Sequence, residues 1–371
     1  MNDSDTRLCL KLHSIPGLSD ALLTRLFLHY GNPQAFWNSN PVNEWRSLGI
    51  SREVIVVAQR TLQSSNSPGS VDIEAQLESL AKVGADILPV TDPGYPALLR
   101  TIYDPPPLLY VRGNAVVLQE AQLAVVGARK ASPAGCRAAR SLSGQLVDAG
   151  LHICSGLALG IDAEAHRAAL AAGGSSIAVM ATGIDVIYPA RHKTLATELL
   201  ATGCLVTEYP PGCQPERYRF PRRNRILSGL SLGVLVVEAA LPSGSLITAG
   251  TALEQGREVF ALPWSMFHEA GRGCLRLIRD GAKMVESVQD ILDELGPLYT
   301  LQQGLCRHDS TVAELPAGGP GEIFAMIGYE VVTVAELVQG SALPVATVMA
   351  ALSVLELEGR IFRCAGGYIH A

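Results

Sequence analysis

The chain has 371 residues and a formal net charge of -6, and 48% of its residues are hydrophobic while 5% are aromatic. This length predicts two or three domains with a large, mostly aliphatic core. No apolar run reaches the roughly 18 to 20 residues of a membrane span, and the N-terminal MNDSDTRLCL lacks the basic-then-apolar pattern of a secretory signal. The eight cysteines form no CxxC pair. We therefore expect a cytoplasmic protein with reduced thiols and without a zinc site, disulfide framework or membrane span.

Residues 1–62 predict a small helical domain. The turn Ile15-Pro16-Gly17-Leu18 joins two apolar helical runs and resembles a helix-hairpin-helix unit, which can hold a DNA phosphate with its turn amides. The turn has few basic neighbours, so we favour a packing role over DNA contact. Residues 63–71, QSSNSPGSV, are rich in Ser, Pro and Gly and predict a linker.

Residues 72–298 follow an α/β pattern. Short aliphatic runs alternate with helical runs, and the expected strands cover residues 123–127, 151–156, 175–183, 204–210, 232–240 and 257–263. Strands that are apolar throughout, rather than at every second position, indicate a parallel sheet covered by helices on both faces. The ligand site of such a sheet is expected at the carboxyl ends of its strands.

Residues 299–320 predict a second linker, and residues 321–371 predict a winged helix from three helical runs followed by a hairpin. A helix that reads duplex DNA needs Lys or Arg. The candidate helix at 344–359 has neither and contains Glu356 and Glu358, while the wing supplies only Arg360 and Arg363. We therefore favour protein contact or packing over duplex recognition for this domain.

An arginine-rich segment lies at 217–230, RYRFPRRNRILSGL. Five arginines fall within nine residues, and Phe220 stands among them. Guanidinium groups this close repel one another unless an anion lies between them, and an apolar ring beside them suits a stacked base. The alternative is a solvated basic loop before a helix, with Phe220 in the core.

Glycine and serine recur at the expected strand ends, as in Gly127, Ser155-Gly156 and Ser243-Gly244. Glycine allows close approach of the backbone, and helix N-termini attract anions. A nicotinamide dinucleotide site would need GxGxxG after the first parallel strand and a carboxylate after the second, and neither is present. The GxxxxGK[ST] phosphate loop is also absent. No cofactor is therefore expected.

Three further motifs have more than one interpretation. Asp162 and His166 share a helix face, and we favour capping of free amides by Asp162 over an acid–base or metal pair. Ser243-Gly244-Ser245 lacks the GxSxG context of a nucleophile, so anion binding by its amides is favoured. Glu238 could be catalytic, but we prefer a role in orienting Arg225 or a loop amide.

Seven segments together resemble the bacterial DNA-processing protein A (DprA/Smf) family, in order and in spacing. They are VGARKASPAG, SGLALGIDAEAH, GIDVIYPARH, TEYPPG, FPRRNRILSGLS, VVEAALPSGSLITA and ALEQGREVFALP. The resemblance implies an extended Rossmann fold that binds single-stranded DNA, forms a homodimer and loads the RecA recombinase in natural transformation, with no known catalysis. It also implies a DNA pocket at Arg129, Arg217 and Phe220, walled by Arg222, Asn224 and Arg225.

The sequence departs from the family pattern at four places. Ala128 replaces a usual serine, and His192 replaces the usual asparagine of a YPxxN motif. Pro263-Trp264 replaces Pro-Gly, and Gly273-Cys274-Leu275 replaces a GxN segment. These changes affect the expected loop geometry but leave the arginine-rich segment intact.

The leading hypothesis is a non-enzymatic mediator that binds single-stranded DNA. Phosphates would be held by Arg129, Arg217, Arg222, Arg223 and Arg225, a base would stack on Phe220, and the amides near Ser155-Gly156 and Ser243-Gly244 would complete the pocket. One alternative is an enzyme that hydrolyses a nucleotide N-glycoside, with Glu238 or Glu254 as the catalytic carboxylate. Another is a transcription regulator that uses the winged helix.

Overall fold

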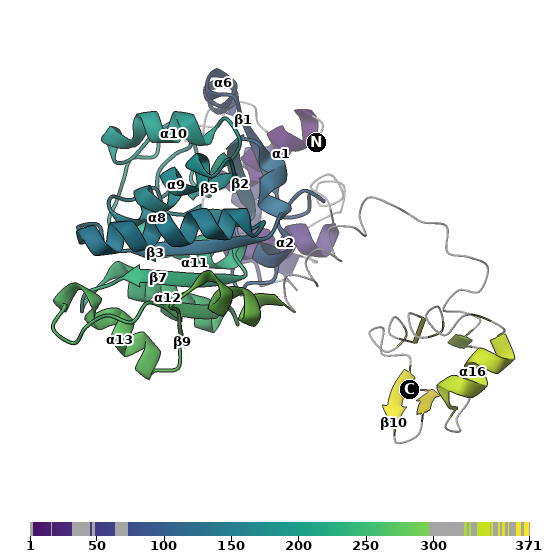
Figure 1. Cartoon of the computed structure of the whole chain (residues 1–371). Helices are drawn as coiled ribbons and strands as arrows, with labels where there is room; N and C mark the ends of the chain where they lie inside the picture. The colour runs from purple at the N-terminus through teal and green to yellow at the C-terminus, as the bar shows by residue number, and fades with distance from the viewer. Residues whose placement is uncertain are drawn as a thin grey trace. The chain divides into compact units, whose positions relative to one another are not determined.

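The computed structural model (Figure 1) describes residues 3–15, 17–31, 45–46, 49–63 and 73–296 of one compact unit, which extends over 1–306. In the second unit, 307–371, it describes residues 323–324, 326–327, 332–341, 343, 348, 351–352, 355, 361–364 and 367–370. Apart from Gln63, the last residue of a helix, the expected linker at 63–71 lies outside the described residues, as do the expected linker at 299–320 and the charged positions Glu356, Glu358 and Arg360. The predicted domain limits stay predictions.

A nine-stranded sheet organises the first unit in the order β1-β2-β6-β5-β4-β3-β7-β8-β9. From β6 to β9 every neighbouring pair is parallel, while β1 and β2 add an antiparallel edge beside β6. The strands are β1 Ala85–Pro89, β2 Leu108–Gly113, β3 Gln122–Gly127, β4 His152–Ser155, β5 Ser176–Val179, β6 Cys204–Thr207, β7 Gly233–Glu238, β8 Glu258–Ala261 and β9 Lys283–Met284. The prediction of an α/β fold with an extended Rossmann-like sheet is confirmed, although β1, β2 and β9 were not among the expected strands.

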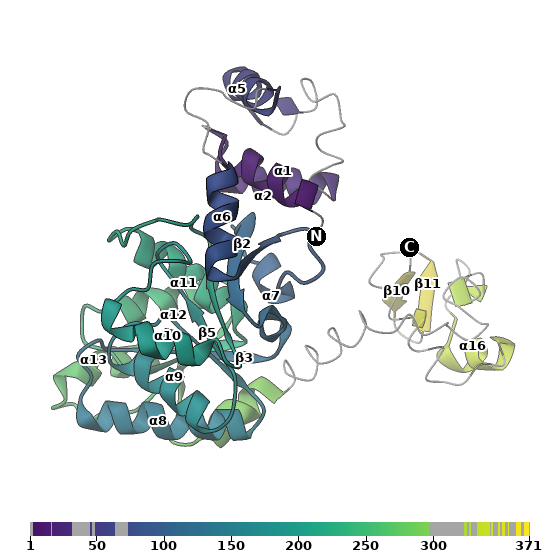
Figure 2. The same ribbon diagram turned by 90° about the horizontal axis from the view of Figure 1, so that it is seen from above.

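Helices cover both faces of this sheet, as Figures 1 and 2 show. On β3, Leu123 and Val125 enter one hydrophobic cluster, while Ala124 and Val126 enter the other. This alternation follows from the two-residue period of a strand and explains why both faces must be apolar. The helices that complete these layers are α7 Ala97–Arg100, α8 Pro133–Asp148, α9 Ile161–Ala171, α10 Lys193–Leu199, α11 Arg219–Leu230, α12 Gly244–Glu254 and α13 Arg272–Arg279. Short 3-10 turns lie at Ala115–Gln119, Ala190–His192 and Glu269–Gly271.

The N-terminal helices share the hydrophobic core of the sheet. They are α1 Asp3–His13, α2 Asp20–Tyr30, α5 Arg52–Gln63 and α6 Ile73–Val83. Leu10, Leu23 and Phe27 are buried in the same cluster as Leu99 and Tyr110 of the α/β part. The Thr24 hydroxyl also donates to the Pro105 carbonyl, at 2.9 Å. A packing role therefore has direct support, while Pro16 of the predicted hairpin turn lies outside the described residues.

The second unit contains the winged-helix domain. Its described elements are α16 Val334–Ser341 and an antiparallel hairpin of β10 Ile361–Cys364 with β11 Gly367–His370. A bridge between Val332 and Tyr368 ties the chain before α16 to the hairpin. The unit has its own apolar core, in which Leu337, Leu352 and Ile361 are buried.

Candidate nucleic-acid interface

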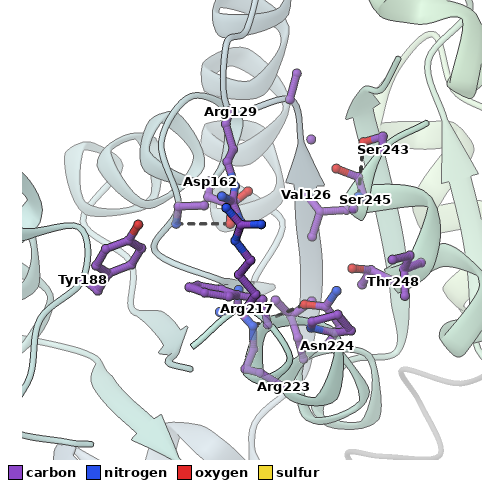
Figure 3. A pocket seen from close by; sticks show the side chains of 18 residues that line it. Val126, Arg129, Asp162, Tyr188, Arg217, Arg223, Asn224, Ser243, Ser245 and Thr248 are labelled. Atoms are coloured by element: carbon purple, nitrogen blue, oxygen red, sulfur yellow. Dashed lines mark hydrogen bonds between the residues drawn. The ribbon is translucent and has the colours of Figure 1, made fainter. Parts of the chain in front are cut away.

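A cavity of about 520 Å³ lies at the carboxyl ends of β3 and β7. The strand order reverses here, because the chain runs outward from β3 through β6 and then returns to place β7 on the other side of β3. Loops after neighbouring strands diverge at such a switch point and leave a crevice. Figure 3 shows Arg129 from the loop after β3 on one side, and Ser243 and Ser245 after β7 on the other.

Two exposed arginines and an aromatic ring form the open part of this cavity. Arg129 and Arg217 both line it, and neither has an ion pair to a carboxylate among the described residues. Phe220, in the first turn of α11, is half-buried, and the Arg129 guanidinium carbon lies 5.3 Å from its ring centroid. Tyr188 is 45% exposed and tilts against Phe220 with 5.8 Å between ring centroids. Among the described residues, two guanidinium groups without a carboxylate partner thus line the cavity together with a pair of rings that solvent can reach.

Arg223 forms the floor of the cavity and is 5% exposed. Its guanidinium donates to the carbonyls of Gly156, at 2.9 Å, and Val179, and to the Asn224 side chain at 3.3 Å. A Cβ at Gly156 would lie 2.5 Å from this guanidinium, so a side chain there would displace it. Burial lowers the pKa of Arg223, while the nearby Asp162 carboxylate favours its charged form. Arg223 therefore ties the ends of β4 and β5 to α11.

Asp162 organises the loop that leaves β4. Its carboxylate accepts the amides of Gly156, at 3.1 Å, and Ala158, at 3.3 Å, so it binds free amides of the loop before α9 rather than those at the start of the helix. Burial raises the pKa of Asp162, against the opposing effects of Arg223 and these amides. Within the loop Leu157 has a φ of 55°, a left-handed conformation that costs energy in a residue with a side chain.

His192 holds this strained loop in place. It is 4% exposed, and its Nδ1 lies 2.9 Å from the Leu157 carbonyl oxygen. A carbonyl can only accept, so Nδ1 carries the proton. The histidine thus supplies the N–H donor that the usual asparagine at this motif position would also offer.

The opposite wall comes from the start of α12. Ser243 caps this helix, and its hydroxyl accepts the Ser245 amide at 3.2 Å. Ser243, Gly244, Ser245 and Thr248 all line the cavity, as does Asn224 from α11. This wall offers hydroxyl groups and a helix N-terminus, which favour an anion or a polar base edge.

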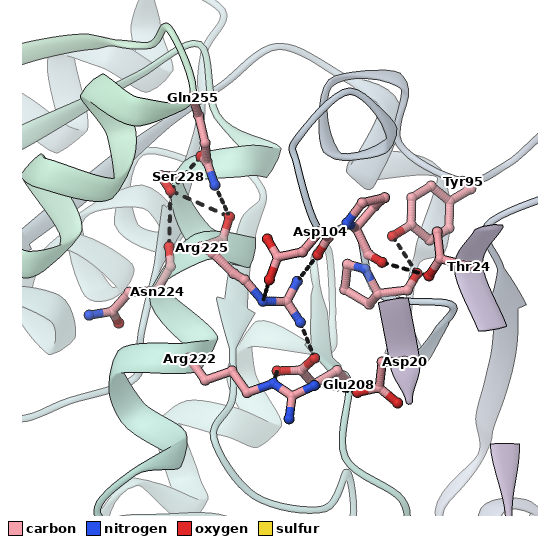
Figure 4. Close-up of polar contacts among 12 residues, drawn as sticks. Asp20, Thr24, Tyr95, Asp104, Glu208, Arg222, Asn224, Arg225, Ser228 and Gln255 are labelled. Carbon is pink, nitrogen blue, oxygen red and sulfur yellow. Dashed lines mark hydrogen bonds and ion pairs between the residues drawn. The ribbon is translucent and has the colours of Figure 1, made fainter. Parts of the chain in front are cut away.

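The remaining predicted arginines, Arg222 and Arg225, do not line the cavity but contact carboxylates (Figure 4). Arg225 is 7% exposed, forms an ion pair with Glu208 and approaches an Asp104 carboxylate oxygen with Nε at 3.1 Å. Arg222 pairs with Asp20 of α2 and reaches Glu208 with Nε at 3.5 Å. Burial raises the pKa of Glu208, and the two guanidinium groups oppose that effect. This cluster joins α11 to β6, to the loop before β2 and to α2.

The cavity thus brings together seven of the eleven predicted site residues: Arg129, Arg217, Phe220, Arg223, Asn224, Ser243 and Gly244. Arg222 and Arg225 lie at the internal ion-pair cluster instead. Ser155 and Gly156 lie beneath the floor, where the Ser155 hydroxyl donates to the Val125 carbonyl at 2.6 Å and the Gly156 amide is taken by Asp162. The polar groups of Arg222, Arg225, Ser155 and Gly156 contact other groups of the protein. We therefore assign these four residues a structural role rather than contact with a ligand.

The carboxylates considered for a catalytic role lie outside the cavity. Glu238 is fully buried and accepts the Ser132 amide at 2.8 Å, so it orients a loop amide as preferred, rather than Arg225. Glu254 is exposed at the end of α12 and does not line the cavity. His166 Nδ1 lies 2.7 Å from the Ser176 hydroxyl, and burial lowers the pKa of His166 to about 3. It is a neutral core histidine.

Tyr188, Asp162 and Thr248 line the cavity but were not predicted as site residues. The sequence carried a signal for Tyr188, since it follows an expected strand with a proline after it. In the described part of the chain, no group of three or more His, Cys, Asp or Glu residues could hold a metal ion. No helix described by the structure is long and apolar enough to cross a membrane.

Comparison with known proteins shows which family the chain resembles. A sequence model described as DNA recombination-mediator protein A matches residues 86–296, and a DprA winged helix domain model matches residues 311–367. Protein Smf of Escherichia coli is 43% identical over 303 residues, which cover 80% of each chain. DNA processing protein DprA of Streptococcus pneumoniae is 46% identical over 205 residues, which cover 55% of this chain and 72% of that protein.

Solved structures agree with these sequence matches. The structure of DprA from Streptococcus pneumoniae has a TM-score of 0.68 and 38% identity, and the match covers 78% of this chain and 98% of that one. DNA processing protein A from Helicobacter pylori, described for its single-stranded DNA binding mode, has a TM-score of 0.53 and 28% identity, with coverage of 58% and 97%. The chain therefore belongs to the DNA recombination-mediator protein A family.

Proposed function

We propose that this protein binds single-stranded DNA in the cavity between β3 and β7, with Arg129 and Arg217 on phosphates and a base stacked beside Phe220 and Tyr188. Membership of the family supports this assignment, as does the likeness to the Helicobacter protein described for its single-stranded DNA binding mode. The observation that carries the proposal is the pair of exposed arginines without carboxylate partners among the described residues. Guanidinium groups attract phosphates, and accessible rings accept any base.

The chemistry of the cavity favours a single strand over a duplex. Its aromatic rings lie inside a concave site, where an unstacked base can enter but a paired base cannot. The net charge of the chain is -6, so a polyanion is attracted only locally, by this patch. Bases stacked in a duplex present only their edges to the grooves.

A titration with single-stranded oligonucleotides at several salt concentrations tests the proposal. Two phosphate contacts predict a log–log slope of affinity against salt of about -1.4, from roughly -0.7 for each contact. Arg217→Ala should reduce the slope by about half. Arg276→Ala is the matched control, because it removes the same charge from a side chain that is 66% exposed and outside the cavity. A wild-type slope near zero would refute the phosphate contacts.

The wider role that we propose is that of a cytoplasmic, non-enzymatic homodimer that protects incoming DNA and loads the RecA recombinase in natural transformation. Family membership supports this role, and mixing the protein with RecA on DNA coated by a single-strand binding protein would test it. Hydrolysis of a nucleotide N-glycoside has weaker support, because Glu238 and Glu254 do not line the cavity. Release of free base from nucleoside monophosphates would restore that alternative.

A further inference from the structure

Glu238 holds both ends of the loop that carries Arg129. Its backbone carbonyl accepts the Ala128 amide at 2.7 Å, and its side-chain Oε2 accepts the Ser132 amide at 2.8 Å. A five-residue loop is thereby attached at its first and last residues to a single residue of β7. A loop fixed at both ends loses most of its conformational freedom before any ligand binds.

The packing around this carboxylate is close. Glu238 is 0% exposed, and a Cβ at Gly135 would lie 2.5 Å from its Oε2, so a side chain there would displace the carboxylate. The carboxylate also lies at the N-terminus of α8, where Ser132 is the capping residue. The positive end of the helix dipole favours a negative charge at this place.

Among the described residues, the His268 side chain contacts Glu238, with Nε2 at 2.5 Å from Oε1. The histidine stacks on Trp264 with 4.4 Å between ring centroids, and the Trp264 indole donates to the Val237 carbonyl at 2.8 Å. A Cβ at Gly271 would clash with Trp264 at 2.4 Å. The segment from Trp264 to Gly271 is therefore built around the far side of the Glu238 carboxylate.

We infer that Glu238 and His268 are positioning residues for DNA binding, which hold the 128–132 loop so that Arg129 reaches a phosphate in the cavity. This inference rests on the proposed function. Glu238 and His268 do not line the cavity, so they would affect DNA binding only through the position of Arg129. Trp264, where the sequence departs from the family pattern, stacks on the histidine that contacts Glu238.

Replacement of the Ser132 amide tests the inference directly. Ser132 has a φ of -68° and a ψ of 158°, which suit proline, so Ser132→Pro removes the N–H that Glu238 accepts. Ser132→Ala is the matched control, because it loses the same capping hydroxyl but keeps the amide. We expect Ser132→Pro to bind a single-stranded oligonucleotide about tenfold more weakly than Ser132→Ala, as expected for one charged hydrogen bond.

The same pair of variants in an Arg129→Ala background separates positioning from general stability. If Glu238 acts through Arg129, the difference between Ser132→Pro and Ser132→Ala should fall to within about twofold. An undiminished difference, or equal affinities when Arg129 is present, would overturn the inference. If Arg129→Ala itself leaves affinity unchanged, the phosphate contact of the proposed function is wrong as well, and both fall together.

His268 provides a second measurement that holds even if Ser132→Pro does not fold. The side chain is 28% exposed, so truncation is tolerable. His268→Ala should weaken binding by several-fold, and His268→Gln, which keeps a side-chain N–H donor, should restore most of it. Equal affinity of His268→Ala and the wild type would overturn the role of the histidine.

Discussion

The two sides of α11 place arginine side chains in different surroundings. Arg222 and Arg225 on one side are paired with Asp20, Asp104 and Glu208, while Phe220, Arg223 and Asn224 on the other side form the cavity. Residues three apart share a helix face, so a continuous run of charge is divided between two environments by geometry alone. The number of arginines in a segment therefore overstates the number available to a ligand, since availability depends on the carboxylates that other elements supply.

The largest expected effect is on the paired side of the helix. Arg225→Ala leaves the carboxylate of Glu208, which is 5% exposed, without its closest partner, and such losses cost about 3–5 kcal/mol of unfolding free energy. Arg217→Ala, on an exposed residue of the cavity, should cost about 0.5 kcal/mol or less. Urea denaturation of both variants measures the contrast. Equal stabilities would mean that the two sides do not differ as described.

Most of the fold could be predicted from the sequence, because parallel strands buried on both faces read as continuous aliphatic runs. The edge strands β1 and β9 could not be predicted, because they lack such a run. Lys283–Met284 is two exposed residues long, and Ala85–Pro89 alternates exposed and buried positions next to a turn, so neither carries an unbroken apolar signal.

The site could be predicted only in part, because ion pairing joins residues that are distant in sequence. Nothing near Arg225 in the sequence indicates that Asp104 and Glu208 will lie beside it. The same holds for Glu238 and His268, which lie thirty residues apart. By contrast, Arg129 and Ser243 follow aliphatic strands directly, and the carboxyl ends of parallel strands meet at one edge of the sheet.

The second prediction concerns the cavity side, through Phe220. Base stacking on an aromatic ring is worth about 1–3 kcal/mol, so Phe220→Ala should weaken single-strand binding by roughly 5- to 150-fold. The salt slope should hardly change, because no phosphate contact is removed. Phe220→Trp should retain most of the affinity, since it keeps an aromatic face.

A core role for Phe220 would give the opposite pattern. Truncation of a fully buried phenylalanine costs about 3–5 kcal/mol of unfolding free energy, but Phe220 is only half-buried. Thermal unfolding of Phe220→Ala alongside the binding measurement separates the two. Unchanged affinity with a large fall in melting temperature would remove the stacking interaction from the proposed function.

A smaller effect is expected where α2 meets the paired side of α11. Although burial opposes ionisation of Asp20, His13 and Arg222 together hold the pKa of this carboxyl below its usual 3.8. A lowered pKa adds stability that is present above the unfolded value and is lost as the pH falls through the folded value. Asp20→Asn should therefore be less stable than the wild type at neutral pH, by about 0.5–1 kcal/mol, and this difference should shrink below about pH 4. A difference that is the same at pH 3 and pH 7 would contradict the ionic role of Asp20.

The smallest expected effect is that of removing the winged helix. If Arg129 and Arg217 supply the phosphate contacts, we expect residues 321–371 to add no important contact, because they contain two arginines, no lysine and five glutamates. Deleting these residues should leave single-strand affinity within about threefold and the salt slope unchanged. The first unit has its own continuous core, so the truncated protein should unfold cooperatively, and its melting curve is the control. A hundredfold loss of affinity in a folded truncation would move part of the DNA-binding surface from the cavity to the winged helix.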